Sequence, residues 1–84
     1  MKLRMLYFAQ LRERFAVDCE IIEVPASLDV NGLLSYLRRR GGVWKDALAE
    51  SQKVCVAVDQ KMVPTSYPLS PGVEVALFQP VTGG

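Results

Sequence analysis

LDVNGLLSYLRRRGG, residues 28–42, carries the clearest helix signal in the chain. Asp29 can cap the helix by accepting hydrogen bonds from free backbone N–H groups, and Leu28 can pack on Leu33 as a hydrophobic staple. Gly41 suits the left-handed residue that commonly follows a helix. Four apolar residues follow the i, i+3, i+4, i+7 spacing of one buried stripe: Val30, Leu33, Leu34 and Leu37. The stretch therefore predicts one main amphipathic helix.

Three consecutive arginines, Arg38, Arg39 and Arg40, stand at the end of this predicted helix. Positive charge stabilises the negative end of a helix dipole, and this is the interpretation that we favour for all three. A nucleic-acid patch is the alternative. The net charge of +1 and the lack of stacking aromatic residues beside the arginines make it the weaker one.

Upstream of the helix, residues 2–8 alternate between apolar and other side chains, as a strand does. Its core face is predicted to hold Leu3, Met5 and Tyr7. Phe8 falls on the opposite face, where a large apolar side chain is out of place on a solvated surface. We therefore treat Phe8 as a candidate contact residue. A short helical turn over 9–14 and a second strand over 19–24 are expected to follow.

Downstream of the helix, residues 44–48 predict a short second helix, and residues 54–58 predict a strand with Val54, Val56 and Val58 inward. Asp59 and Gln60 can turn the chain into residues 61–63, with Met62 outward.

The last predicted strand, 73–78, follows Ser70-Pro71-Gly72-Val73, which fits a type II turn. Its alternation points Val73, Val75 and Leu77 inward. Glu74, Ala76 and Phe78 are then outward.

The order of these elements predicts an α+β fold. If the first and last strands are parallel central neighbours and the helix covers one face, the result is a ubiquitin-like β-grasp, a mixed sheet packed on one main helix. Phe8 and Phe78 then lie on the uncovered face, near the C-terminal end of the last strand. We expect this face to bind a partner.

Composition limits the range of functions. The 84 residues fit one domain, which should bury somewhat over 60% of the surface that its unfolded chain exposes. Half of the residues are hydrophobic, so we expect apolar side chains at the surface, where a contiguous patch usually marks a partner. The near-zero net charge does not indicate nucleic acid or an anionic membrane as a partner. Lys2 and Arg4 interrupt the first apolar run, so we expect no signal peptide, no membrane span and a cytoplasmic protein.

The numbers of cysteine and histidine residues exclude several kinds of metal and catalytic site. The chain has Cys19, Cys55 and no histidine, so it offers neither a Cys/His metal set nor a histidine-based catalytic triad. We interpret both cysteines as reduced packing residues. No metal or bound cofactor is expected.

The C-terminal residues read QPVTGG over positions 79–84. Because Pro80 has no N–H for a sheet ladder, the strand should stop at Phe78, leaving a domain over 1–78 and a flexible, extended tail over 79–84. Such a tail spans at most about 20 Å. Gly83 and Gly84 have no side chains, so the reactive group at the tip is the α-carboxylate, a plausible substrate for another enzyme. The alternative is a frayed terminus without a function.

Three stretches together resemble one known family: YFAQLRE at 7–13, VAVDQ at 56–60, and PLSPGVEVALFQPVTGG at 68–84. They are similar to the small, sulfur-carrier subunit of molybdopterin synthase, the MoaD family, and the similarity extends over essentially the whole chain. Its most specific part is the Phe-x-Pro-Val-Thr-Gly-Gly ending.

The resemblance implies that an ATP-dependent, E1-like adenylating enzyme activates the Gly84 carboxylate and converts it to a thiocarboxylate. The tail, Pro80, Val81, Thr82 and Gly83, would then enter the large synthase subunit, where sulfur passes to cyclic pyranopterin monophosphate. It further implies that the catalytic side chains belong to that subunit, so this chain has none of its own. Phe8, Met62 and Phe78 match the family's hydrophobic contact surface.

Three other functions remain open at this stage. A sulfur carrier for thiamine synthesis or tRNA thiolation would use the same tail and the same activation. A protein-conjugating ubiquitin-like modifier would form isopeptide bonds with lysines. A binding module with an inert tail would be unaffected by loss of the two glycines.

Overall fold

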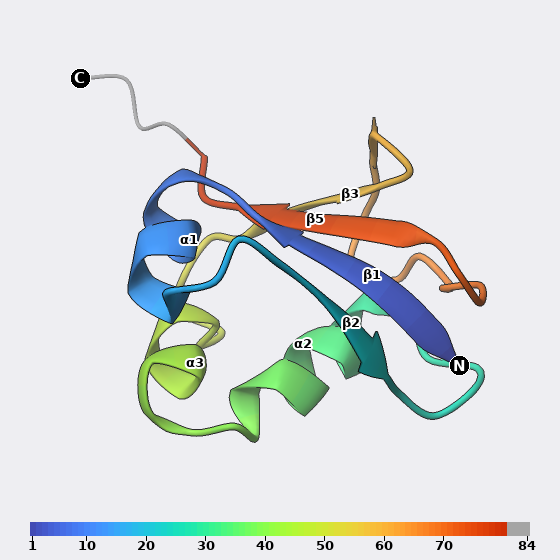
Figure 1. The fold of residues 1–84 in the computed structure, drawn as a ribbon, viewed down its shortest axis with the longest axis horizontal. Helices are drawn as coiled ribbons and strands as arrows, with labels where there is room; N and C mark the ends of the chain where they lie inside the picture. Colours follow the sequence, from blue (N-terminus) through green and yellow to red (C-terminus); the bar gives the residue numbers. More distant parts are fainter. Residues whose placement is uncertain (81–84) are drawn as a thin grey trace.

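The computed structural model describes residues 1–80, and its ribbon shows one sheet with helices packed beneath it (Figure 1). The elements in chain order are β1 (Lys2–Tyr7), α1 (Ala9–Phe15), β2 (Cys19–Glu23), α2 (Val30–Arg38), α3 (Gly42–Ala47), β3 (Cys55–Val58), β4 (Lys61–Met62) and β5 (Glu74–Phe78).

The sheet has the strand order β2-β1-β5-β3-β4. β1 and β5 are parallel central neighbours, with Arg4 opposite Glu74 and Tyr7 opposite Leu77, while the other strand pairs are antiparallel. Helices α2 and α3 lie against one face, and α1 lies at the end of the sheet where β1 and β5 finish (Figure 1). The predicted mixed sheet with a parallel central pair is confirmed.

Helix α2 begins at the predicted cap. Asp29 Oδ1 accepts a hydrogen bond of 2.8 Å from the Gly32 N–H, which satisfies one of the free donors at the helix start. A Cβ on Gly32 would come within 2.6 Å of Leu28 Cδ1, so the missing side chain leaves room for Leu28 to lie over the first turn. The four predicted stripe residues are all buried: Val30, Leu33, Leu34 and Leu37.

The helix ends earlier than the sequence predicted. Its last residue is Arg38, and the N–H groups of Arg40 and Gly41 bond to carbonyl oxygens three residues back, at 3.1 and 3.0 Å. Such tightened turns are common at helix ends. Gly41 still has the expected left-handed backbone, with φ of 76°, and it leads directly into α3.

Two of the three arginines, Arg38 and Arg40, bind separate partners through their side chains. Arg38 lies in the last turn of α2 and donates 2.9 Å hydrogen bonds to the Leu48 carbonyl oxygen and to Ser35 Oγ. Arg40 lies beyond the helix and binds both carboxylate oxygens of Glu20 on β2, at 2.8 and 3.1 Å. The predicted place in the last helical turn is therefore confirmed for Arg38, whereas Arg39 is the cap residue that follows the helix. The prediction is wrong for Arg40, which lies beyond the helix and whose charge is neutralised by a residue far away in sequence.

One core fills the space between the sheet and the helices. The inward residues of the strands meet the stripe of α2, and Leu11 of α1 and Ala47 of α3 belong to the same buried cluster. As predicted, Val56 and Val58 point inward, whereas Val54 precedes β3 and is half-buried. The strands contribute Leu3, Met5, Tyr7, Ile22, Val56, Val58, Val75 and Leu77 to this core.

Both predicted turns around β4 and β5 are present. Asp59 and Gln60 have φ of 48° and 70° and form a two-residue hairpin between β3 and β4. Gly72 has φ of 81°, and the Val73 N–H bonds to the Ser70 carbonyl oxygen at 3.4 Å. Within residues 1–80, no helix has the length and apolar character needed to span a membrane.

Candidate functional site

The uncovered face of the sheet carries a row of side chains that runs across four strands. Leu6 of β1 is opposite Ala76 of β5, Ala76 is opposite Ala57 of β3, and Ala57 is opposite Met62 of β4. Residues opposite each other in a sheet share a face, so these four form one transverse row. Met62 is 62% exposed at the end of this row.

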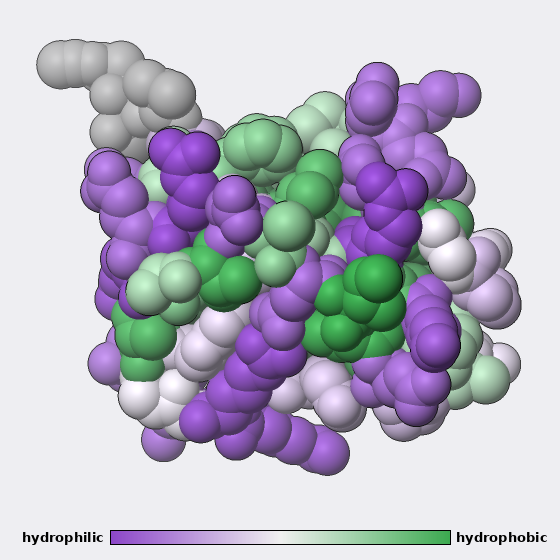
Figure 2. Space-filling model, in the orientation of Figure 1, coloured by the Kyte–Doolittle hydropathy of each residue, from purple (hydrophilic) through white to green (hydrophobic). Residues whose placement is uncertain are grey.

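A groove of about 660 Å³ lies along this face, and we call it the open-face groove. Hydrophobic side chains lie over β1 and β5 in the upper part of Figure 2, with hydrophilic ones between them. Ala76 was predicted to be outward, and it does face the groove, but it is only 8% exposed because its neighbours flank it. The groove is lined by Leu6, Phe8, Ala9, Ala57, Gln60, Glu74, Ala76, Phe78 and Gln79.

Phe8 and Phe78 stand at the same end of the groove, because they follow the paired residues Tyr7 and Leu77 of two parallel strands. β1 ends at Tyr7, one residue earlier than predicted, and Phe8 becomes the extended residue before α1. Its N–H still donates to the Leu77 carbonyl oxygen, at 3.2 Å. Phe8 is 45% exposed and Phe78 is half-buried, so both present apolar surface beside the end of β5.

The opposite end of the groove is polar. Arg4 Nη2 lies 3.4 Å from Glu74 Oε1, with the Arg4 side chain 61% exposed and that of Glu74 19% exposed. The backbone of Glu74 is fixed by the hairpin, because its N–H donates to Asp59 Oδ1 at 3.0 Å and its carbonyl accepts from the Asp59 N–H at 2.9 Å. The groove thus has an aromatic end and an acidic end.

Beneath the aromatic end, three rings from three elements pack together. Trp44 of α3 stacks on Phe15 of α1, with ring centroids 3.8 Å apart, and Tyr7 of β1 meets both rings edge-on at 5.3 Å. The guanidinium of Arg40 lies 4.4 Å from the centre of the Trp44 ring. This aromatic cluster ties β1, α1 and α3 together below Phe8.

A charged hydrogen-bond network completes the aromatic cluster. The Tyr7 hydroxyl donates to Glu20 Oε2 at 2.7 Å. Burial, and then the bond to Glu20, raises the pKa of Tyr7 well above its ordinary value, so the hydroxyl remains a donor. Partial burial acts to raise the pKa of Glu20, but hydrogen bonds from Arg40 and Tyr7 outweigh it and leave that pKa below its usual range. The network therefore holds a charged carboxylate at neutral pH.

The predicted tail begins where β5 ends. β5 stops at Phe78, as the position of Pro80 predicted, and Gln79 lines the open-face groove. Val81, Thr82, Gly83 and Gly84 lie outside the described residues. Their roles, and the division into a domain over 1–78 and a tail over 79–84, stay predictions.

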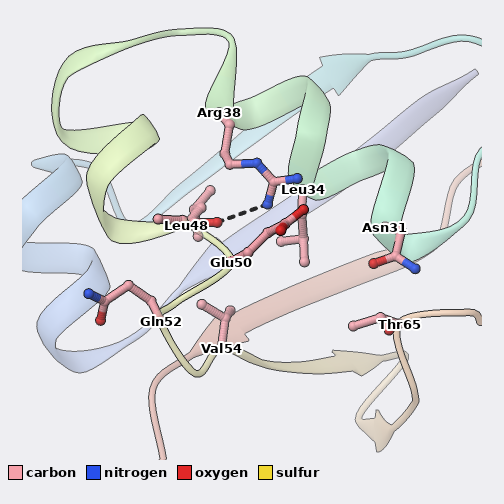
Figure 3. A pocket seen from close by; sticks show the side chains of 9 residues that line it. Asn31, Leu34, Arg38, Leu48, Glu50, Gln52, Val54 and Thr65 are labelled. Carbon is pink, nitrogen blue, oxygen red and sulfur yellow. Dashed lines mark hydrogen bonds between the residues drawn. The ribbon is translucent and has the colours of Figure 1, made fainter.

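A second, smaller pocket of about 240 Å³ lies on the helix side of the chain (Figure 3). Asn31, Leu34 and Arg38 of α2 line one wall. The other lining residues are Leu48, Ala49, Glu50, Gln52, Val54 and Thr65. The dashed line in Figure 3 shows that Arg38 already binds the Leu48 carbonyl. This pocket contains none of the residues predicted to contact a partner.

The cysteines and acidic residues do not assemble a reactive centre among residues 1–80. No three His, Cys, Asp or Glu side chains in this part of the chain are close enough together to hold a metal ion. Cys19 is exposed, so its interpretation as a packing residue is wrong, whereas Cys55 is half-buried. The neighbouring Asp18 carboxylate raises the pKa of the Cys19 thiol, which disfavours the nucleophilic thiolate.

Several residues of the site were not singled out from the sequence. Ala57 and Gln60 join the groove because of the register between β3 and its neighbours, and Glu20 joins the aromatic cluster through a contact across the fold. Phe15 could have been found, because it lies four residues after Leu11 on the buried side of a short helix.

Similarity to known proteins covers nearly the whole chain. The family model described as the ThiS family matches residues 5–84. The chain belongs to the ThiS family. Among its relatives is a protein of Escherichia coli (strain K12) named molybdopterin synthase sulfur carrier subunit, which is 40% identical over 83 residues, or 98% of this chain and 99% of the relative. A Haemophilus influenzae protein of the same name is 37% identical over 82 residues, which are 98% of this chain and 99% of the relative.

Solved structures show the same fold. A putative molybdopterin converting factor, subunit 1, from Pyrococcus furiosus superimposes on this ThiS-family chain with a TM-score of 0.80 at 30% identity, covering 96% of this chain and 99% of the other. A complex of subunits 1 and 2 of the molybdopterin-converting factor from Helicobacter pylori contains a chain with a TM-score of 0.67 at 20% identity, with both chains fully covered. The ubiquitin-like β-grasp fold and the resemblance to molybdopterin synthase sulfur carriers are thus confirmed.

Proposed function

We propose that this ThiS-family chain is the sulfur-carrier subunit of a molybdopterin synthase. The observation that carries the proposal is the 40% identity, over 98% of the chain, to a protein with that name. The open-face groove supports it, because apolar surface beside the end of β5 would hold a partner next to the tail. We place the protein in the cytoplasm, as the sequence led us to expect.

The chemistry begins at the Gly84 carboxylate. A terminal carboxyl group has an ordinary pKa of about 3.5, so it is ionised at neutral pH and can attack the α-phosphate of ATP. An E1-like adenylating enzyme supplies the ATP, and pyrophosphate leaves. A sulfur nucleophile then displaces AMP from the acyl-adenylate, and Gly84 becomes a thiocarboxylate. The chain itself binds no cofactor in this scheme.

Sulfur delivery takes place in the large subunit. Pro80, Val81, Thr82 and Gly83 pass into its active site, where the glycine permits passage through a channel that a Cβ would block. Phe8, Met62 and Phe78 hold the two subunits together from the open face of the sheet. Each thiocarboxylate transfers one sulfur atom to cyclic pyranopterin monophosphate and returns to a carboxylate, so two loaded chains supply the two sulfur atoms of the dithiolene. The catalytic side chains belong to the large subunit.

Intact mass spectrometry tests the proposal. The purified chain is incubated with its cognate adenylating enzyme, ATP and a sulfur source. We expect a mass increase equal to the replacement of one oxygen by sulfur, located on the C-terminal peptide and abolished by deletion of Gly84. The loaded chain with the large subunit should then convert cyclic pyranopterin monophosphate to molybdopterin.

The two steps separate the possible failures. No mass shift, with an enzyme that is active on another carrier, would refute the sulfur-carrier assignment. A loaded chain that delivers sulfur to a thiamine precursor or to tRNA, and not to the pterin, would refute the pathway.

A further inference from the structure

The open-face groove has a hollow floor. Two alanines, Ala57 and Ala76, lie opposite each other in the middle of the transverse row, between the larger side chains Leu6 and Met62. An alanine side chain ends at Cβ, so the middle of the row is lower than its ends. The depression has the form of a hole for one bulky side chain.

Aromatic side chains stand at one end of this hole. Phe8 and Phe78 both line the groove, and the aromatic cluster beneath Phe8 fixes the backbone from which it projects. Rigid, partly exposed aromatic groups around an apolar hollow are typical of the centre of a binding interface. The apolar part of the groove is therefore preorganised to receive an aliphatic or aromatic group.

A single charge stands at the other end. Of the described residues that line the groove, Glu74 alone is charged. Arg4 Nη2 contacts Glu74 Oε1 at the long distance of 3.4 Å, and the Arg4 side chain is mostly exposed. A partner that covered the groove with apolar groups would take this carboxylate out of water without replacing its hydrogen bonds, which is costly. A partner that binds well must bring a donor to Glu74.

We propose that the groove receives one segment of the large synthase subunit that places a bulky apolar side chain over Ala57 and Ala76 and a lysine or arginine at Glu74. This inference rests on the proposed function and specifies how the partner is selected. Charge complementarity disfavours a second copy of this chain as the occupant. A second copy would bring the same acidic groove to this face, and its neighbouring cation, Arg4, already contacts its own Glu74.

Two substitutions test the two halves of the proposal, by calorimetric titration of the full-length chain with the cognate large subunit. Ala57→Leu fills the hole with a larger side chain. Because Ala57 is outward and half-buried, we expect the variant to fold, and circular dichroism checks that it does. Glu74→Gln keeps the shape and removes the charge. We expect each to weaken binding about tenfold or more. The effect of Glu74→Gln should shrink as salt is raised, because salt screens the wild-type pair.

Matched controls come from β2 on the same face. Ile21→Ala removes an apolar side chain that is 69% exposed, and Glu23→Gln removes an exposed charge, both outside the groove. Each should bind within about twofold of wild type, as expected for surface changes away from an interface.

Each outcome decides the matter. Affinities of Ala57→Leu and Glu74→Gln within twofold of wild type would overturn the proposal, and an unchanged Glu74→Gln alone would overturn its cationic half. Concentration-dependent dimerisation of the wild type that Ala57→Leu abolishes would assign the groove to a second copy instead. If the sulfur-loaded wild type does not bind the large subunit at all, the proposed function fails and the inference fails with it. Normal sulfur loading with unchanged binding of the variants refutes the inference alone.

Discussion

Tyr7→Phe is the most direct test of the aromatic cluster that supports the candidate site. The substitution removes one oxygen from a ring that is 1% exposed and packs edge-on against Phe15 and Trp44. The ring contacts remain. The loss is therefore confined to the 2.7 Å hydrogen bond between the hydroxyl and Glu20.

The expected cost follows from the charge on the acceptor. Hydrogen bonds to charged groups contribute about 1.5–3 kcal/mol to stability. Glu20 keeps both bonds from Arg40 after the substitution, so we expect the lower end, about 1.5 kcal/mol. For a domain of this size, that corresponds to a fall of about 6–12 °C in the midpoint of thermal unfolding.

Urea unfolding followed by fluorescence measures this cost, because Trp44 is the single tryptophan of the chain and lies in the aromatic cluster. Tyr36→Phe is the matched control, since Tyr36 lies at the surface, and it should change the free energy of unfolding by less than about 0.5 kcal/mol. A Tyr7→Phe variant as stable as wild type would refute the reasoning that the Tyr7–Glu20 bond holds this end of the fold.

Three further predictions concern stability. Glu20→Gln removes a carboxylate whose folded pKa is lowered, so its contribution is present above its unfolded pKa of about 4.3 and is lost as pH falls through the folded pKa. The unfolding free energy of the variant, measured by urea titration at each pH, should therefore fall less than that of wild type below about pH 4.3. Gln60→Gly should raise stability by about 0.5 kcal/mol, measured by thermal unfolding, because glycine adopts the φ of 70° without the Cβ strain. Asp29→Ala should lower the free energy of unfolding by about 1 kcal/mol, measured in urea, because the cap to the Gly32 N–H is lost. Asp29→Asn should keep most of the wild-type stability, because its side-chain oxygen can accept the same hydrogen bond.

These predictions fail in distinct ways. Parallel pH profiles for wild type and Glu20→Gln would show that the carboxylate has the same pKa in the folded and unfolded chain. A Gln60→Gly variant of unchanged or lower stability would show that the left-handed backbone of Gln60 does not strain the hairpin. Equal losses for Asp29→Ala and Asp29→Asn would mean that charge, and not the hydrogen bond to Gly32, stabilises the start of α2.

Local patterns predicted the elements whose causes are local. The Asp29 cap, the stripe of α2 and the turn at Gly72 each depend on residues within a few positions, and all three are present. Parity along β1 and β5 also placed Phe8 and Phe78 on one face, because side chains alternate strictly in a strand.

Contacts between distant residues were harder to predict. Arg40 finds Glu20 twenty positions away, and no local spacing indicates that pair. Ala76 was correctly placed outward, but its burial depends on the register that sets Leu6 on one side and Ala57 on the other. The hollow of the groove is a property of three strands together, so the sequence of one strand does not reveal it.

The parallel pairing of β1 with β5 makes the domain indivisible. Arg4 and Glu74 are 70 positions apart, so forming this pair closes a loop of most of the chain, and sheets dominated by such distant pairs fold slowly. A backbone break within the exposed residues 50–53 would leave β1 and β5 on different pieces. Neither piece then holds both central strands, and both contribute walls to the open-face groove. The two fragments should regain the sheet only by associating, which makes the chain suitable for fragment complementation, with recovery of the groove as its signal.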